Sequence, residues 1–175
     1  MATQNYFTNY TESFANAVSK HTGVRKHFLQ KTVSVLAADD NGSTYLLFKD
    51  VPWNARIASL IIENEAITGG TAYDIGLYNS RTGAVVDVDC LAANLDLSAA
   101  HKKGFDGTAA NLALDGMAAL THEQTLFSLY EIAGGAVDSP DKEGDLPMYD
   151  IVLTADTVGT GAGKITARME LIPAG

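Results

Sequence analysis

The sequence predicts a mainly β protein, an antiparallel sandwich or barrel, and three observations support this. Short stretches in which apolar and polar residues alternate recur along the chain, as in Thr32–Leu36. Turn-forming residues separate these stretches at intervals of about ten residues, a spacing typical of all-β folds. Two strand-like stretches, Tyr149–Thr154 and Lys164–Ile172, close the chain around a turn rich in Gly, Thr and Ala.

The composition is that of a folded domain of 175 residues. Apolar residues make up 46% of the chain and charged residues 19%, well away from the composition of disordered proteins. No apolar run approaches the roughly 20 residues that span a bilayer, and the N-terminus lacks the basic and apolar regions of a secretory signal. We therefore expect synthesis in a cytoplasm and no membrane partner.

Charge is distributed unevenly along the chain. The formal net charge is −9, but residues 1–30 hold three cations and one anion, a charge of +2 that leaves −11 for the rest. A body this acidic repels nucleic acid, so we expect no nucleic-acid partner.

Residues 1–30 are predicted to form an N-terminal arm, extended or partly helical, ahead of a body at residues 31–175. The arm shows no strand alternation, whereas Phe14 and Val18 fall at helical spacing ahead of Gly23. It also carries four aromatic residues within nine positions, a costly set to leave in water. These rings pack either on the same chain or on another, and the sequence leaves both open.

The body opens with a predicted hairpin. Thr32–Leu36 and Tyr45–Phe48 flank Asp39–Gly42, a strong turn signal, and Pro52 breaks the second strand. Arg56–Glu63 follows as a strand apolar enough for the centre of a sheet.

A second predicted hairpin pairs Tyr73–Tyr78 with Ala84–Val86 around the turn Asn79–Gly83. Cys90–Leu97 is expected to be a strand or an extended edge. Ser98–Asp115 contains glycines, two adjacent lysines and much alanine, which indicates a long surface loop or a short helix.

One short helix is predicted at about residues 121–133. Thr121–Gln124 forms a capping box, apolar residues follow at helical spacing, and a Gly-Gly pair ends the helix. An acidic loop, Val137–Leu146, then leads into the closing hairpin Tyr149–Ile172.

The reactive side chains match no catalytic pattern. The four histidines lack metal-ligand spacing, and Cys90 lies in an apolar stretch that suits a small buried residue. Gly159–Lys164 departs from the spacing of a phosphate loop and leads into a strand where that motif needs a helix. We expect no enzyme activity, no metal and no cofactor.

One acidic cluster offers an alternative. Asp87 and Asp89 lie two apart, so both carboxylates face the same side of a strand, and Asp96 is nearby. Together they suit a Ca²⁺ site or a pair of acid catalysts, provided that they converge in a cleft. Ordinary solvated residues at strand ends are the simpler interpretation.

A second alternative is a recognition module that binds carbohydrate. Trp53, Tyr73 and Tyr78 would then be stacking platforms. Such a module needs two or more exposed rings on one face of the body, which separates it from a Trp wedged at the rim of the core.

Several strings of the body resemble those of small structural proteins of tailed bacteriophages. They are Val51–Ile57, with its Pro-x-Asn-Ala-Arg-Ile entry to a strand, Tyr73–Tyr78, Gly83–Ser98, the predicted helix Leu126–Ala133, and Tyr149–Thr154 with the Gly/Thr-rich turn before Lys164–Thr166. The similarity extends over roughly residues 31–172, and the family is that of head decoration, or cement, proteins.

The resemblance implies a jelly-roll-like antiparallel β-sandwich that assembles as a homotrimer at capsid symmetry axes and has no catalytic site. It also implies a function, decoration and stabilisation of a phage capsid by bridging capsomers, on the virion exterior and with the major capsid protein as partner. The carbohydrate-binding alternative would then be a host-recognition module on a head fibre or tail. The arm is not covered by the resemblance. Its aromatic and basic residues are nonetheless our candidates for contacts with the capsid or between protomers, namely Tyr6, Phe7, Tyr10, Phe14, Arg25 and Lys26.

Overall fold

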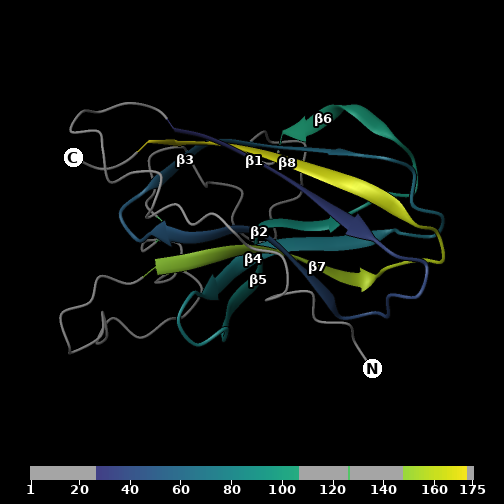
Figure 1. Ribbon diagram of the computed structural model, residues 1–175, viewed down its shortest axis with the longest axis horizontal. Helices are drawn as coiled ribbons and strands as arrows, with labels where there is room; N and C mark the ends of the chain where they lie inside the picture. The colour runs from purple at the N-terminus through teal and green to yellow at the C-terminus, as the bar shows by residue number, and fades with distance from the viewer. Residues whose placement is uncertain (1–26, 107–125, 127–147, 173–175) are drawn as a thin grey trace.

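Eight strands form two antiparallel sheets that lie face to face (Figure 1). The structure is a computed structural model that describes residues 27–106, 126 and 148–172. The first sheet has the order β1-β8-β3-β6, and the second has the order β2-β7-β4-β5. The strands are β1 (His27–Val35), β2 (Ser43–Pro52), β3 (Arg56–Asn64), β4 (Ala72–Asn79), β5 (Val85–Leu95), β6 (His101–Asp106), β7 (Met148–Thr157) and β8 (Gly163–Ile172).

The strand order is that of a jelly roll. Hydrogen-bonded partners are β1 with β8, β2 with β7, β3 with β6 and β4 with β5, all antiparallel. This is the pairing of one long hairpin, folded back between β4 and β5 and then wrapped into two sheets. Further pairing of β3 with β8 and of β4 with β7 joins the strands within each sheet. The predicted mainly β, jelly-roll-like sandwich is confirmed.

The core fills the space between the sheets. Alternate residues of each strand point inward, so that Leu60 and Ile62 of the first sheet join Ile75 and Ile151 of the second in one buried cluster. Cys90 belongs to the same cluster and is 2% exposed, which confirms its predicted role as a small buried residue. Burial raises the pKa of its thiol far above the usual range.

The first predicted hairpin is wrong. The strands on either side of residues 36–42 lie in different sheets, since β1 pairs with β8 and β2 pairs with β7. The intervening loop is built by Asp39, whose carboxylate accepts hydrogen bonds from the Leu36 N–H at 2.9 Å and the Tyr45 hydroxyl at 2.7 Å. The turn signal is real, but a loop longer than a tight two-residue turn allows the chain to change sheet.

The closing hairpin is wrong for the same reason. Strand β7 lies in the second sheet between β2 and β4, whereas β8 lies in the first sheet between β1 and β3. Residues 158–162 therefore cross from one sheet to the other. The turn leads directly into β8, as predicted, so no helix N-terminus follows it that could bind a phosphate.

The second predicted hairpin is confirmed. Strands β4 and β5 pair across a turn in which Asn79 donates its N–H to the Ala84 carbonyl at 2.8 Å, and the Asn79 side chain accepts the N–H groups of Arg81 and Thr82. Strand β5 is one continuous element where the sequence predicted two pieces. The predicted end of β2 at Pro52 and the central position of β3 are also confirmed.

Two predicted boundaries change. Strand β1 begins at His27 rather than at Lys31, so residues 27–30 belong to the sandwich. Strand β6 occupies part of Ser98–Asp115, which was expected to be a loop or a helix, because its backbone pairs with the outer edge of β3.

Most of the predicted helix at about residues 121–133 and all of the acidic loop Val137–Leu146 lie outside the described residues. Leu126 is the exception: it is fully buried in the core cluster and donates its N–H to the Ala55 carbonyl at 3.1 Å.

Candidate functional site

The predicted contact residues of the arm, Tyr6 to Lys26, lie outside the described residues, and their role stays a prediction. What the structure describes is the strand that follows the arm in the chain. Strand β1 starts immediately after Lys26, and its second residue, Phe28, is 76% exposed. Phe28 is the most exposed of the three large apolar side chains that the described residues present to solvent, the others being Leu36 and Val85, so the surface around Phe28 is the candidate site.

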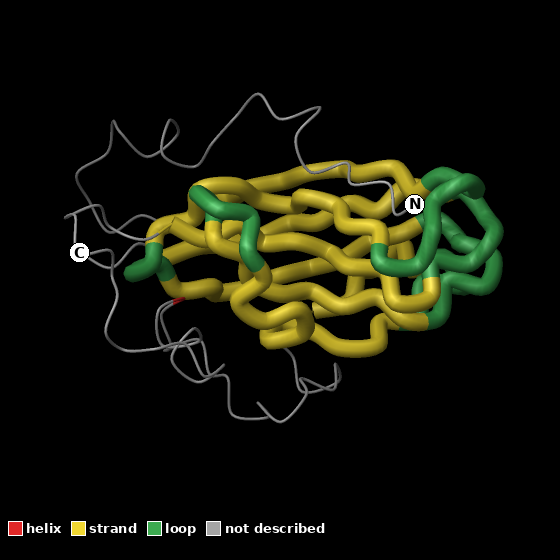
Figure 2. The backbone as a smooth tube through the Cα atoms, turned by 90° about the horizontal axis from the view of Figure 1, so that it is seen from below, coloured by secondary structure: helices red, strands yellow, loops and turns green. Residues whose placement is uncertain are grey.

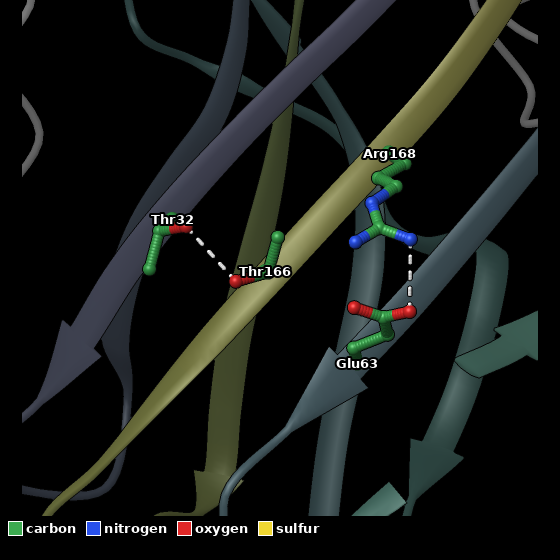
Figure 3. Close-up of polar contacts among 4 residues, drawn as sticks. All are labelled: Thr32, Glu63, Thr166 and Arg168. Carbon is green, nitrogen blue, oxygen red and sulfur yellow. Dashed lines mark hydrogen bonds and ion pairs between the residues drawn. The ribbon is translucent and has the colours of Figure 1, made fainter. Parts of the chain in front are cut away.

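The outer face of the first sheet is open to solvent. Burial alternates along β1 and β8, with mostly polar residues outside, Phe28 being an exception, and mostly apolar residues inside. On the outside, the Thr32 and Thr166 hydroxyls hydrogen-bond across the β1–β8 pair at 2.9 Å (Figure 3). Arg168 forms an ion pair with Glu63 of β3 at 2.9 Å (Figure 3). These neighbouring pairs order the face without covering it.

The outer face of the second sheet is buried instead. On β4 and β7 nearly every residue is buried, including those that point away from the core. Leu46, Tyr78 and Val152 form a second apolar cluster there, and the Tyr78 hydroxyl hydrogen-bonds to Thr154 at 2.8 Å. Within the described part of the chain the two outer faces of the sandwich therefore differ: that of the first sheet is solvated, whereas that of the second sheet is largely buried.

Part of this cover comes from β5. Between the pairs Ile75–Ala92 and Leu77–Asp87, strand β5 has more residues than β4, and its surplus forms a large bulge. The bulge passes over Gly76, where a Cβ atom would overlap the backbone of Asp87 and Val88. Only glycine leaves room for this crossing.

Two buried carboxylates on the same face fix irregular backbone in the edge strands. Asp150 of β7 accepts the N–H of Asp50 at 2.9 Å, and Asp74 of β4 accepts the N–H of Asn94 at 2.7 Å. Asp50 and Asn94 both have φ of 55°, a left-handed conformation that costs about 1 kcal/mol or more outside glycine. Ser80 also donates its hydroxyl to the Asp50 carboxylate.

One end of the sandwich is closed by four loops that cross between the sheets, residues 36–42, 65–71, 96–100 and 158–162 (Figure 2). Backbone hydrogen bonds tie neighbouring loops together, such as Ile67 N–H to Leu97 carbonyl at 3.0 Å and Thr160 N–H to Thr68 carbonyl at 2.8 Å. Gly159, with φ of 82°, lies directly against the backbone of Thr68 to Gly70. These hydrogen bonds and close backbone contacts interlock the loops at this end of the sandwich.

Side chains from the strands reinforce the same end. The Asn64 amide donates to the carbonyls of Glu65, Leu97 and Ala99 at 2.8 to 3.0 Å, and its oxygen lies 2.9 Å from Nδ1 of His101. The Tyr73 hydroxyl donates to the Val158 carbonyl at 2.9 Å. This use of Asn64 and His101 had no sequence signal, because the two residues are 37 positions apart.

The acidic cluster does not assemble into a metal site. Asp87 accepts the N–H of Asp89 at 3.2 Å, and Asp96 accepts the N–H of Ser98 at 2.9 Å, so two of the three carboxylates support local turns. Hydrogen bonds from Ser98 lower the pKa of Asp96. Among the residues that the structure describes, no three His, Cys, Asp or Glu side chains are placed to hold a metal ion.

The predicted stacking platforms are overturned by burial. Tyr73 is 0% exposed and Tyr78 is 5% exposed, because both rings fill apolar clusters and neither faces solvent. Trp53 is half-buried and packs against the core, as expected for a ring at the rim. A sugar has no pair of exposed rings to stack on at these positions.

Sequence reasoning missed Phe28 by assigning it to the arm. A signal was present: Phe28, Gln30, Thr32 and Ser34 are exposed and alternate with less exposed residues up to Val35. Extending the period-2 pattern backward from Thr32 would have placed Phe28 on the outer face of a strand.

In the described part of the chain there is no helix long and apolar enough to cross a membrane.

Comparisons with known proteins add a structural likeness and no family. No family model and no curated protein matches the chain. Among solved structures, the chain is similar to a protein in the Cyanophage Pam1 capsid asymmetric unit, with 10% sequence identity and a TM-score of 0.46 over 99% of both chains. At this level the likeness assigns no function.

Proposed function

We propose that this protein is a virion structural protein, without enzymatic activity, that decorates and stabilises a phage capsid by bridging capsomers as a homotrimer. The observation that carries the proposal is the open outer face of the first sheet, with exposed Phe28 two residues beyond the arm. The jelly roll occurs in viral capsid proteins but also in lectins and cupins, so the fold by itself does not decide the function. Short sequence segments within residues 31–172 resemble those of decoration proteins, and this resemblance favours a capsid protein over a lectin or a cupin.

A decoration protein must resist the outward pressure of packaged DNA, which demands a stiff body. The interlocked loops at one end of the sandwich and the pinned edge strands of the second sheet supply that stiffness. Several modest contacts to neighbouring capsomers then act together, because each bound contact raises the effective concentration of the next.

The arm is proposed to supply further contacts. Its aromatic residues Tyr6, Phe7, Tyr10 and Phe14 and its basic residues Arg25 and Lys26 suit an acidic protein surface. The arm orders on the capsid or exchanges between protomers of the trimer. The protein is then made in the host cytoplasm and carried on the outside of the virion.

Co-sedimentation with capsids tests this function. Capsids are assembled from the major capsid protein encoded in the same genome and mixed with the purified protein. We expect the protein to sediment with capsids and to run as a trimer in light scattering. A full-length variant with Tyr6, Phe7, Tyr10 and Phe14 changed to serine should keep its melting temperature and lose capsid binding. Failure of the unaltered protein to sediment with capsids refutes the proposed function.

A further inference from the structure

The loop between β1 and β2 contains Asn41 followed by Gly42, the one Asn-Gly pair in the sequence. Gly42 has φ of 85°, a left-handed conformation that glycine adopts without strain, so the turn favours a glycine at this position. Both residues are exposed. In an Asn-Gly pair the backbone nitrogen reaches the preceding side-chain amide with little obstruction, because glycine has no side chain. The turn therefore places a chemically labile pair on the surface.

Deamidation of such a pair begins with attack of the Gly42 nitrogen on Cγ of Asn41. A bond forms between these two atoms, the bond from Cγ to Nδ2 breaks, and the amide proton of Gly42 leaves with Nδ2 as ammonia. Water then opens one of the two C–N bonds of the cyclic imide and leaves aspartate or isoaspartate at position 41. The reaction thus requires that the Gly42 N–H lose its proton, and the imide has no N–H at that nitrogen.

In the folded protein the end of β7 holds both reacting groups. The Gly42 N–H donates to the Ala155 carbonyl at 2.6 Å, and Oδ1 of Asn41 accepts the N–H of Val158 at 3.0 Å. The first of these bonds retains the proton that must leave, and ring closure would abolish it. Val158 is itself anchored, because its side chain is buried and its carbonyl accepts the Tyr73 hydroxyl at 2.9 Å. Reaction therefore requires that the loop and residues 155–158 separate first.

We infer that Asn41 is a deamidation site that the closed loops protect, and that local opening of residues 155–158 makes it reactive. Isoaspartate, one of the two products, lengthens the backbone between positions 41 and 42. The bonds to Ala155 and Val158 then no longer form together at their present spacing, so a loop that opens and reacts does not close again as before. This chemistry is independent of capsid binding, so the deamidation site and the proposed function are tested separately.

Peptide mapping by mass spectrometry measures deamidation at position 41 in the full-length protein. The protein is kept in mildly alkaline buffer, either folded or unfolded in guanidinium chloride. We expect the reaction in the folded protein to be at least about tenfold slower, because only the locally open fraction reacts when reclosing is fast. Equal rates in the two conditions would overturn the inference.

Two matched variants separate local opening from global unfolding. Tyr73→Phe removes the hydroxyl that anchors Val158, whereas Tyr78→Phe removes a buried hydroxyl of the same strand that bonds to Thr154 instead. Each variant loses one buried hydrogen bond, so their melting temperatures should fall by similar amounts. We expect Tyr73→Phe to speed deamidation of the folded protein roughly threefold to tenfold, and Tyr78→Phe to change it by less than about twofold. If both variants speed the reaction equally, or neither does, control by local opening of residues 155–158 is rejected.

Discussion

The carboxylate of Asp150 accepts the backbone N–H of Asp50, a residue 100 positions earlier in the chain. Asp74 and Asn94 repeat this relationship on the other side of the second sheet. Register explains the repeat: Asp74 lies opposite Thr154 and Tyr78 lies opposite Asp150, so β4 and β7 are related by an approximate twofold axis at the pair Gly76–Val152. Each central strand thus holds the irregular edge strand beside it.

The same equivalence appears in the sequence, where Tyr-Asp-Ile occurs at residues 73–75 and again at residues 149–151. In both copies the tyrosine and the isoleucine point into the core, as with Tyr149 and Ile151, while the aspartate points to the outer face. The short repeat therefore marks two strands with one structural task.

Removing either aspartate should destabilise the fold. Asp150→Ala leaves the Asp50 N–H without its acceptor on a buried face, and we expect a loss of about 2 kcal/mol or more in the free energy of unfolding. Asp156→Ala, at an exposed position of the same strand, should change it by less than about 0.5 kcal/mol. Urea denaturation measures the free energy of unfolding of both variants. Equal stability of the two would contradict the role of Asp150 in holding the edge strand.

Gly76→Ala should be among the most damaging single substitutions in the chain. A methyl group there overlaps the Asp87 carbonyl, so β5 must move off the sheet, at a cost of roughly 3 kcal/mol or more. Gly42→Ala is the control, since its Cβ would meet nothing within 4 Å and only the left-handed φ of 85° opposes it. We expect about 1 to 2 kcal/mol for that variant by thermal unfolding. A ranking in the opposite order would rule out the crossing described at Gly76.

Buried tyrosines should make the protein sensitive to alkali. Burial, aided by Asp39, raises the pKa of Tyr73 to about 12, and burial also raises the pKa of Tyr45 and Tyr78. Since the folded state keeps these protons above pH 10, stability is full below pH 10 and falls as the unfolded tyrosines ionise, by about 1.4 kcal/mol per pH unit for each. Absorbance at alkaline pH should show Tyr45, Tyr73 and Tyr78 titrating only as the protein unfolds. Titration of all seven tyrosines near pH 10 in the folded protein would contradict the raised pKa values.

Cys90 should be unreactive in the folded protein. Its side chain is 2% exposed and burial raises the pKa of the thiol, so both access and thiolate formation are suppressed. A thiol reagent should label no cysteine in buffer and one per chain in denaturant. Rapid labelling of the native protein would show that β5 opens locally.

Strand positions could be predicted from the sequence, whereas strand partners could not. Alternation and turn residues located Thr32–Leu36, Arg56–Glu63 and the closing strands because these signals are local. The Asp39–Gly42 turn looks the same whether the next strand returns beside the first or crosses to the other sheet. That choice depends on β7 and β8, more than 100 residues later in the chain.

The candidate surface was only partly predictable. The sequence drew attention to aromatic residues of the arm, Tyr6 to Phe14, whereas Phe28 was assigned to the arm without a role and the structure places it on a sheet face. Its exposure depends on the outward orientation of this position of β1 in the packed sandwich. Tyr78 differs from Phe28, since it is buried on the outer face of the second sheet. The pattern of apolar and polar residues along a strand therefore does not reveal which outer face is covered.

By itself, the sequence determined that this chain is a β-sandwich with a small buried cysteine, because hydrophobic alternation and turn chemistry act over a few residues. Only the tertiary structure decided which strands share a sheet, why Gly76 and the two Tyr-Asp-Ile aspartates are needed, and which face stays open. These features come from hydrogen bonds and packing between segments far apart in the chain, and no local pattern encodes them.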